Sequence, residues 1–186
     1  MRVRRNLACQ RAQDILATVP QARQAGNIDP YAVAEHYGIV VRKGPLEDSL
    51  SGFLVHDGSG KAFIGINDSD NLRRQRFTLA HELGHYFLHD RSDVFFDTGA
   101  GQLRLMARDD LSKEGTDFRE VEANLFAAEL LMPSELIRRD LQDYTHVDLF
   151  GDEVSESIIS DLARKYNVSV RAMTVRLERL GLLMES

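Results

Sequence analysis

The chain is predicted to adopt an α+β fold, in which a small antiparallel sheet packs with two long helices and a C-terminal helix-turn-helix-like segment follows. Three observations predict this arrangement. Short β-like runs separated by turn residues fill residues 39–67. A helix at residues 77–89 is apolar almost all the way round and carries the sequence His-Glu-Leu-Gly-His. Near the C-terminus, two short helical patterns flank a turn at residues 167–169.

Composition and charge exclude several classes of protein. The net charge of −6 argues against a dominant phosphate-binding surface, so DNA is not the expected partner. No apolar run is long enough to span a bilayer, and the basic residues 1–11 are not followed by a signal-peptide core, so we expect a cytoplasmic location and no membrane contact. Cys9 is the only cysteine, so any metal must be held by histidine and carboxylate side chains.

Two helices are predicted before the sheet. The first covers residues 6–25, with Pro20 expected to break it near its end. The second covers residues 30–37, because Asp29 suits the N-cap, a proline follows at the first helical position and Gly38 marks the end. The apolar side of the first helix is formed by Ala8, Ala12, Ile15, Leu16 and Val19.

Three strands are predicted next, at residues 39–42, 52–56 and 62–67. The sequence Asp-Gly-Ser-Gly at residues 57–60 predicts a hairpin turn between the second and third strands. An antiparallel sheet should therefore lead into the helix that carries the motif. The strand at 62–67 is expected to be an edge strand, with which an extended peptide could pair.

The motif helix is expected to begin near Asp70 or Asn71, and it places a group of chemically active side chains together. The step from His81 to His85 is about 400° of helix rotation, so the two imidazoles lie one turn apart on one face and can reach one ion. Glu82 lies about 100° round from His81, where a carboxylate can act as a base toward a metal-bound water. The three residues therefore predict a metal site with a base beside it.

The apolar character of this helix predicts that it is buried. Burying its polar stripe without partners would cost about 1–3 kcal/mol for each group, and a metal with its water would satisfy these groups. The alternative is a core helix whose histidines bond to backbone carbonyls. The stripe consists of Thr78, His81, Glu82, His85 and His89. The arginines that precede it, Arg73, Arg74 and Arg76, are interpreted mainly as a solvated face.

Residues 90–116 are predicted to be irregular, apart from a short strand at 102–106. They are expected to form either a lid over the cleft or a loop on the surface. A second long helix should then run from Asp117 to Met132, with Asp117 and Glu120 as a capping pair and Pro133 ending it.

The second helix is expected to supply a third metal ligand, Glu120. On a helical wheel, small and apolar residues fall within about 100° of Glu120 on either side, and a carboxylate in such surroundings needs a partner. Glu122 and Glu129 fall about 180–200° away and are predicted to form a solvated surface pair. Asn124 is placed to hold a ligating histidine, or else to form an ordinary helix-packing hydrogen bond.

The other histidines are not expected to bind the metal. His89 lies about 12 Å along the helix axis from His81, too far to complete one tetrahedral site, and is interpreted as a helix-end residue. His36, His56 and His146 have no ligand spacing and are expected on the surface or in loops.

Two sequence blocks, at residues 76–89 and 120–133, resemble the two signatures of the ImmA/IrrE family of metallo-endopeptidases, and the resemblance extends from about residue 30 to the C-terminus. It implies a zincin-like arrangement in which His81, His85 and Glu120 bind Zn2+, Glu82 is the catalytic acid and base, and Asn124 supports a ligand. It also implies a protein substrate, a helix-turn-helix (XRE-type) repressor, whose cleavage relieves repression in a stress response, a mobile element or a toxin–antitoxin-like module.

The C-terminal residues 158–180 are predicted to form a helix-turn-helix with Ser169 as N-cap of its second helix. Its basic residues are nearly cancelled by acidic ones, so packing on the rest of the protein or gripping a protein substrate is favoured over DNA binding. The basic residues are Arg164, Lys165, Arg171, Arg176 and Arg179.

The leading hypothesis is a zinc endopeptidase with a metallopeptidase domain at residues 1–150 and a helical segment at 151–186. The alternatives are a DNA-binding or repressor-binding regulator whose metal is structural or whose peptidase activity is vestigial, and a toxin–antitoxin component that acts by binding alone. A structural zinc is usually closed by four ligands and does not need Glu82 beside it, which favours the enzyme.

Overall fold

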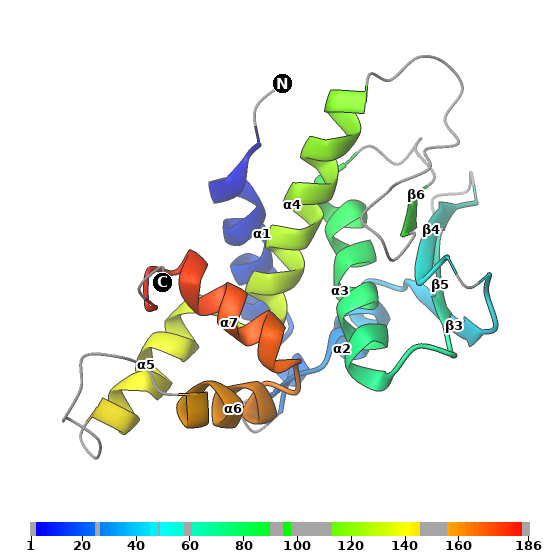
Figure 1. Cartoon of the computed structure of the whole chain (residues 1–186). Coiled ribbons are helices and arrows are strands. Elements are labelled where there is room, and N and C mark those ends of the chain that lie inside the picture. Colours follow the sequence, from blue (N-terminus) through cyan, green and yellow to red (C-terminus); the bar gives the residue numbers. More distant parts are fainter. Residues whose placement is uncertain are drawn as a thin grey trace.

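The computed structural model describes residues 3–24, 27–47, 49–57, 61–89, 95–97, 113–145 and 156–183. The fold is α+β, as predicted: a small sheet lies at one side of the molecule, and the motif helix lies between this sheet and a second long helix (Figure 1). None of the helices in these ranges is long and apolar enough to cross a membrane.

The N-terminal helix α1 (Arg5–Thr18) is shorter than the predicted 6–25. It stops before Pro20, whose ring cannot continue an α-helix, and a 3-10 turn, η1 (Pro20–Ala22), takes its place. Strands β1 (Arg23–Gln24) and β2 (Asn27–Ile28) then pair antiparallel. The predicted apolar side of α1 is confirmed, because its buried residues are Ala8, Ala12, Ile15 and Leu16.

Helix α2 (Pro30–His36) confirms the predicted capping. The Asp29 carboxylate accepts a hydrogen bond from the Tyr31 backbone N–H at 2.9 Å. Gly38 follows the helix with φ of +68°, a left-handed conformation that favours glycine.

The three predicted strands are present, but the sheet is mixed rather than antiparallel. Strands β4 (Gly52–His56) and β5 (Ala62–Asn67) form the expected antiparallel pair. β3 (Val40–Gly44) runs parallel to β5 on its other edge, and β6 (Phe95–Asp97) pairs antiparallel with β4. The order is β3-β5-β4-β6, so β5 is an inner strand and the expectation that it is an edge strand was wrong. The alternation of side chains along a segment predicts that it is a strand, but it does not predict which strands lie beside it. Here β4 pairs with one edge of β5 and β3 pairs with the other.

Strand β6 falls in the segment that was predicted to be irregular. The predicted strand at 102–106 and the central turn residues 58–60 lie outside the described residues.

The motif helix α3 (Leu72–Leu88) begins where expected, since the Asn71 side chain accepts from the Arg74 backbone N–H at 3.0 Å. It packs against β4 and β5 on one side and against α4 (Lys113–Leu131) on the other. Helix α4 begins before Asp117, so the predicted capping pair was wrong. Lysine and glutamate at its start favour helix, and the single glycine that follows costs only about 1 kcal/mol.

Three more helices complete the chain. α5 (Ser134–Thr145), which follows Pro133, was not predicted. α6 (Glu156–Lys165) and α7 (Val170–Arg179) form the predicted helix-turn-helix, and the Ser169 hydroxyl accepts from the Ala172 backbone N–H at 3.1 Å.

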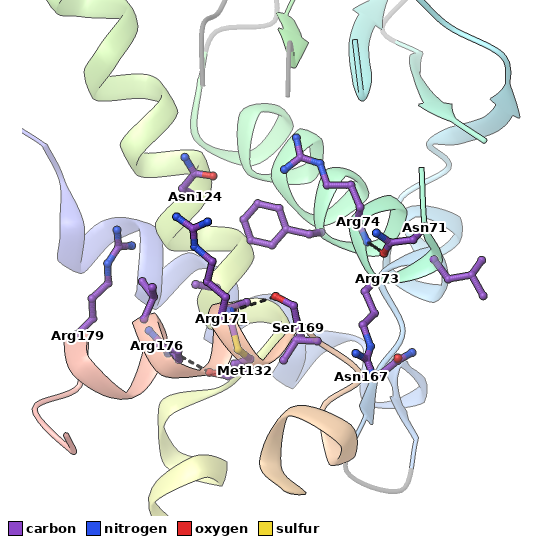
Figure 2. Close-up of a pocket in the computed structure, with 16 residues that line it drawn as sticks. Asn71, Arg73, Arg74, Asn124, Met132, Asn167, Ser169, Arg171, Arg176 and Arg179 are labelled. Atoms are coloured by element: carbon purple, nitrogen blue, oxygen red, sulfur yellow. Dashed lines mark hydrogen bonds between the residues drawn. The ribbon is translucent and has the colours of Figure 1, made fainter. Parts of the chain in front are cut away.

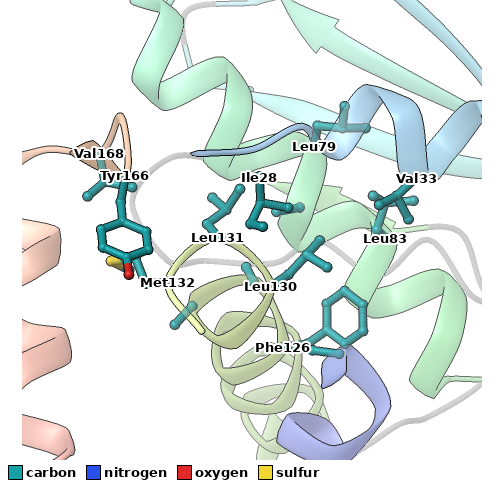
Figure 3. Close-up of a cluster of buried hydrophobic side chains, with 14 of the residues drawn as sticks. Ile28, Val33, Leu79, Leu83, Phe126, Leu130, Leu131, Met132, Tyr166 and Val168 are labelled. Carbon is teal, nitrogen blue, oxygen red and sulfur yellow. The ribbon is translucent and has the colours of Figure 1, made fainter. Parts of the chain in front are cut away.

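One hydrophobic cluster contains residues from α1, α3, α4, α6 and α7. Figure 3 shows part of it, with Leu83 of α3, Leu130 of α4, and Tyr166, which follows α6, among the labelled side chains. Buried residues from both sides of the predicted boundary at residue 150 therefore belong to the same cluster, while the boundary itself lies outside the described residues.

Candidate metal centre

Helices α3 and α4 approach each other closely because a glycine lies at their crossing. A Cβ atom on Gly84 would lie 2.9 Å from the Cα atom of Ala123 and 3.0 Å from its carbonyl oxygen. Any side chain at position 84 would push the helices apart, whereas glycine lets α4 come within reach of the α3 histidines.

The side chains of His81, His85 and Glu120 converge at this crossing. The two Nε2 atoms are 3.0 Å apart. The Glu120 carboxylate lies 3.2 Å from Nε2 of His81 and 2.8 Å from Nε2 of His85. Within the described ranges this is the one group of three potential metal-ligating side chains, and its ligand atoms all lie within 4.8 Å of one another.

The donor set fits a zinc ion. Zinc bound tetrahedrally at about 2.0–2.1 Å separates its ligand atoms by about 3.3 Å, close to the observed spacing. Two imidazoles and one carboxylate are also a ligand set of catalytic zinc sites, in which the fourth position is kept for water or substrate.

The protonation states suit metal binding. Burial lowers the pKa of His85 to about 3, so its imidazole is neutral at pH 7. Burial alone would raise the pKa of Glu120, but its contacts with the rings of His81 and His85 lower it to about 2. Neutral imidazole and ionised carboxylate are the forms that bind a metal.

Asn124 orients His81, as the sequence predicted it could. Its Oδ1 lies 3.1 Å from Nδ1 of His81. A carbonyl oxygen can only accept, so Nδ1 carries the hydrogen and Nε2 presents its lone pair to the centre.

A second chain of contacts orients His85. Nδ1 of His85 lies 3.0 Å from Nδ1 of His89, and Nε2 of His89 lies 3.3 Å from the Glu122 carboxylate. Burial lowers the pKa of His89 to about 4, so this ring is neutral and donates from Nε2 to Glu122. Its Nδ1 must then accept from His85, so Nε2 of His85 presents its lone pair to the centre. His89 lies at the C-cap of α3, as predicted, but it also contacts His85.

Glu122 is therefore not a surface residue, and that prediction was wrong. It is 2% exposed, and Arg4 donates to it from the backbone N–H at 2.7 Å and from the guanidinium at 2.7 Å. A helical wheel places Glu122 on the surface only if α4 has a single buried side. Helix α4 has two, because it packs against α3 on one side and against α1 on another. The spacing of His89 four residues after His85 was the sequence signal that could have indicated a supporting role.

Glu129 was also wrongly predicted to be solvated. It is 2% exposed and forms an ion pair with the buried Arg176 of α7. Gln13 donates to it at 2.9 Å and the Ser134 hydroxyl at 2.9 Å. Arg176 also donates to the Met132 carbonyl oxygen at 3.1 Å, so this cluster joins α7 to the C-terminal end of α4.

The remaining candidate residues are placed as follows. Glu82 is 0% exposed and lies in the buried stretch of α3 between the two histidines. Of the arginines interpreted as solvated, Arg73 is exposed, but Arg76 donates to the Ile28 carbonyl oxygen at 2.8 Å and to the Asn27 side chain, so it ties α3 to β2.

His36 and His56 do not belong to the group of three converging side chains. His36 is exposed at the end of α2, and His56 stacks on Tyr86 with ring centroids 5.8 Å apart. His146 lies outside the described residues.

Known proteins resemble this chain in sequence and in fold. Residues 34–178 match the model of the IrrE N-terminal-like domain. The metallopeptidase ImmA of Bacillus subtilis is 32% identical over 156 residues, covering 84% of this chain and 79% of that protein. Immunity region protein 2 of Bacillus phage phi105 is 33% identical over 131 residues, covering 68% and 70% of the two chains.

Among solved structures, a transcriptional regulator of Mycobacterium tuberculosis has a similar fold, with a TM-score of 0.58 and 18% identity. The match covers 91% of this chain but only 46% of that protein, and it shows the fold alone. The family match and the extent of the similarity to the Bacillus subtilis peptidase lead to one conclusion: this chain belongs to the ImmA/IrrE family of metallopeptidases.

Proposed function

We propose that the protein is a zinc-dependent endopeptidase, with His81, His85 and Glu120 as zinc ligands and Glu82 as the catalytic acid and base. The observation that carries the proposal is the convergence of three ligand atoms within 4.8 Å at the crossing of α3 and α4, with a buried glutamate between the two histidines in sequence.

The roles of the side chains follow from their chemistry. A bound zinc ion would polarise the scissile carbonyl and lower the pKa of a water ligand to about 7. The Glu82 carboxylate accepts a proton from the attacking water and returns it to the leaving amine nitrogen. Asn124 and His89 hold the imidazoles of His81 and His85 in the orientation that presents Nε2 to the centre.

The proposed substrate is a helix-turn-helix (XRE-type) repressor, and its cleavage would relieve repression in a stress response, a mobile element or a toxin–antitoxin-like module. Membership of the ImmA/IrrE family supports this choice, as does the similarity to an immunity region protein of a phage.

The proposal is tested by mapping new protein N-termini. Lysate of the source cells is incubated with the zinc-loaded protein, with the Glu82→Gln variant or with the Glu135→Gln variant, and N-termini are labelled and identified by mass spectrometry. Glu135 is an exposed glutamate of α5, so its replacement makes the same chemical change away from the centre.

We expect a new N-terminus within a helix-turn-helix repressor that appears with the wild type and with Glu135→Gln but not with Glu82→Gln or with a chelator. If the wild type and Glu82→Gln give the same N-termini, the protein does not act as a peptidase, and a regulator that works by binding alone becomes the better description.

A further inference from the structure

A large groove opens beside the metal centre, between the proposed catalytic helices and the C-terminal helix-turn-helix (Figure 2). Its volume of about 890 Å³ lies within the range of about 300–1,000 Å³ that is usual for ligand sites. We refer to it as the α3–α4–α7 groove; its walls include Arg73 and Phe77 of α3, Ala128 of α4, and Arg171, Ala172 and Arg179 of α7.

The groove reaches the metal centre through two shared side chains. Asn124 lines the groove and contacts Nδ1 of His81 at 3.1 Å. Phe77 also lines it, and its ring stacks on His81 with centroids 6.5 Å apart. Figure 2 shows Arg171 extending from α7 toward Asn124. A chain segment that lies in the groove would therefore lie close to His81, a proposed zinc ligand.

The charge of the groove is opposite to that of the whole protein. Among the residues that the structure describes, the charged lining residues are Arg73, Arg74, Arg171, Arg176 and Arg179, with no aspartate or glutamate, although the chain has 29 acidic and 23 basic residues. Glu129 neutralises Arg176, and Arg74 bonds to the Ser51 hydroxyl. The other three are exposed and form no ion pair with any residue that the structure describes.

Apolar side chains lie between these arginines. Leu72 and Val175 line the groove and are 70% and 38% exposed, which is unusual for large hydrophobic residues in this protein. Exposed apolar surface within a concave, charged rim is typical of a site that binds another molecule.

We propose that the α3–α4–α7 groove binds a segment of the protein substrate in which apolar residues are interspersed with aspartate or glutamate. This inference rests on the proposed peptidase function and names the chemistry of its substrate. A protein segment is favoured over a nucleic acid because Phe77 is the only aromatic side chain among the described lining residues, whereas sites for single-stranded nucleic acids usually offer several aromatic stacking surfaces. The inner position of β5 also removes the sheet edge that the sequence suggested for the substrate.

The test measures binding of short synthetic peptides to the Glu82→Gln variant, so that cleavage does not interfere. Three fluorescein-labelled peptides share a leucine pattern and carry glutamate, glutamine or lysine between the leucines. Fluorescence anisotropy gives the affinity of each peptide for the variant alone and after Arg171→Glu and Arg179→Glu are added. Arg42→Glu, a charge reversal at an exposed residue of β3 away from the groove, is the matched control.

We expect the glutamate peptide to bind about tenfold more tightly than the glutamine peptide, and the two groove substitutions to reverse the preference in favour of lysine. The Arg42→Glu control should leave the preference unchanged. Val175→Trp, at an exposed position of α7, should weaken binding of every peptide by filling the groove, and thermal denaturation checks that each variant is folded.

Two results would overturn the inference. The first is an affinity for the glutamate peptide that Arg171→Glu and Arg179→Glu leave unchanged. If the same two substitutions, made in the protein that keeps Glu82, also leave the rate of substrate cleavage at the wild-type value, the peptidase function stands and only the groove assignment fails. The second is tighter binding of a single-stranded oligonucleotide that displaces the glutamate peptide, which would identify the groove as a nucleic-acid site.

Discussion

Each histidine of the candidate metal centre has one ring nitrogen directed at the centre and the other held by a neighbouring side chain. His81 is held by Asn124 at 3.1 Å and His85 by His89 at 3.0 Å. A ring held in this way cannot present the wrong nitrogen, so less order has to be gained when a metal binds. The orientation of both rings therefore depends on residues outside the group of three proposed ligands.

At the residue scale, Glu120→Gln should abolish tight zinc binding, because a neutral amide is a poor replacement for a carboxylate ligand. Glu122→Gln should still bind zinc, but about 10–100-fold more weakly, since His89 loses its charged acceptor and His85 its fixed orientation. Titration with zinc against a competing chelator measures both affinities, and Glu135→Gln serves as the control. Full zinc binding by Glu120→Gln, together with loss by Glu122→Gln, would show that the ligand assignment is wrong.

At the scale of elements, α4 binds three different neighbours through three glutamates. Glu120 faces the histidines of α3, Glu122 binds Arg4 next to α1, and Glu129 binds Arg176 of α7. Only the first of these could be predicted from periodicity. The partners of the other two are 118 and 47 residues away in the chain, and no local pattern indicates such contacts.

The Glu129 ion pair should make stability depend on pH. Burial alone would raise the pKa of Glu129, but the charge of Arg176 and hydrogen bonds from Gln13, Arg176 and Ser134 lower it below its ordinary value of 4.5. The stabilisation is therefore complete above about pH 4.5 and is lost as the pH falls through the lowered pKa.

We expect Glu129→Gln to reduce the free energy of unfolding by about 3–5 kcal/mol at pH 7, because it leaves the buried Arg176 without a counter-charge. The difference from the wild type should shrink as the pH falls below 4.5. Urea denaturation over a series of pH values measures this, and an equal loss at every pH would contradict the ion-pair explanation.

The crossing of α3 and α4 can be tested through Gly84. An added Cβ would meet the Ala123 backbone at 2.9 Å, so Gly84→Ala should destabilise the fold by about 1–3 kcal/mol and also weaken zinc binding by moving Glu120 away from the histidines. Gly44→Ala is the control, because a Cβ there has no heavy atom within 4 Å. Thermal denaturation and zinc titration provide the two measurements. A variant that is destabilised but binds zinc normally would show that the close approach does not position Glu120.

At the scale of the whole molecule, local patterns predicted more of the site than of the assembly around it. The rotation of a helix places His81 and His85 on one face in any context, and the caps at Asn71 and Ser169 depend on adjacent residues. The parallel pairing of β3 with β5 depends on which strands compete for each edge of β5, and adjacent residues do not determine it. Helix α5 was not predicted, although its sequence is amphipathic.

Zinc should stabilise the whole protein, because its proposed ligands come from two helices that meet only in the folded state. A free zinc concentration 100 times the dissociation constant should add about 2.7 kcal/mol to the free energy of unfolding. The melting temperature of the wild type should therefore rise with zinc and fall with a chelator, while that of His81→Ala should not change. A similar zinc response in both proteins would place the ion elsewhere.

The region that matches the family model begins at residue 34, after α1 has ended. Nevertheless α1 covers α4 with a row of buried apolar side chains, and the segment supplies Arg4 to Glu122 and Gln13 to Glu129. A fragment cut at the family boundary would leave two glutamates of α4 without these donors and would expose the apolar surface that α1 covers. We therefore expect a fragment that folds on its own to include α1, although α1 lies before the region that matches the family model.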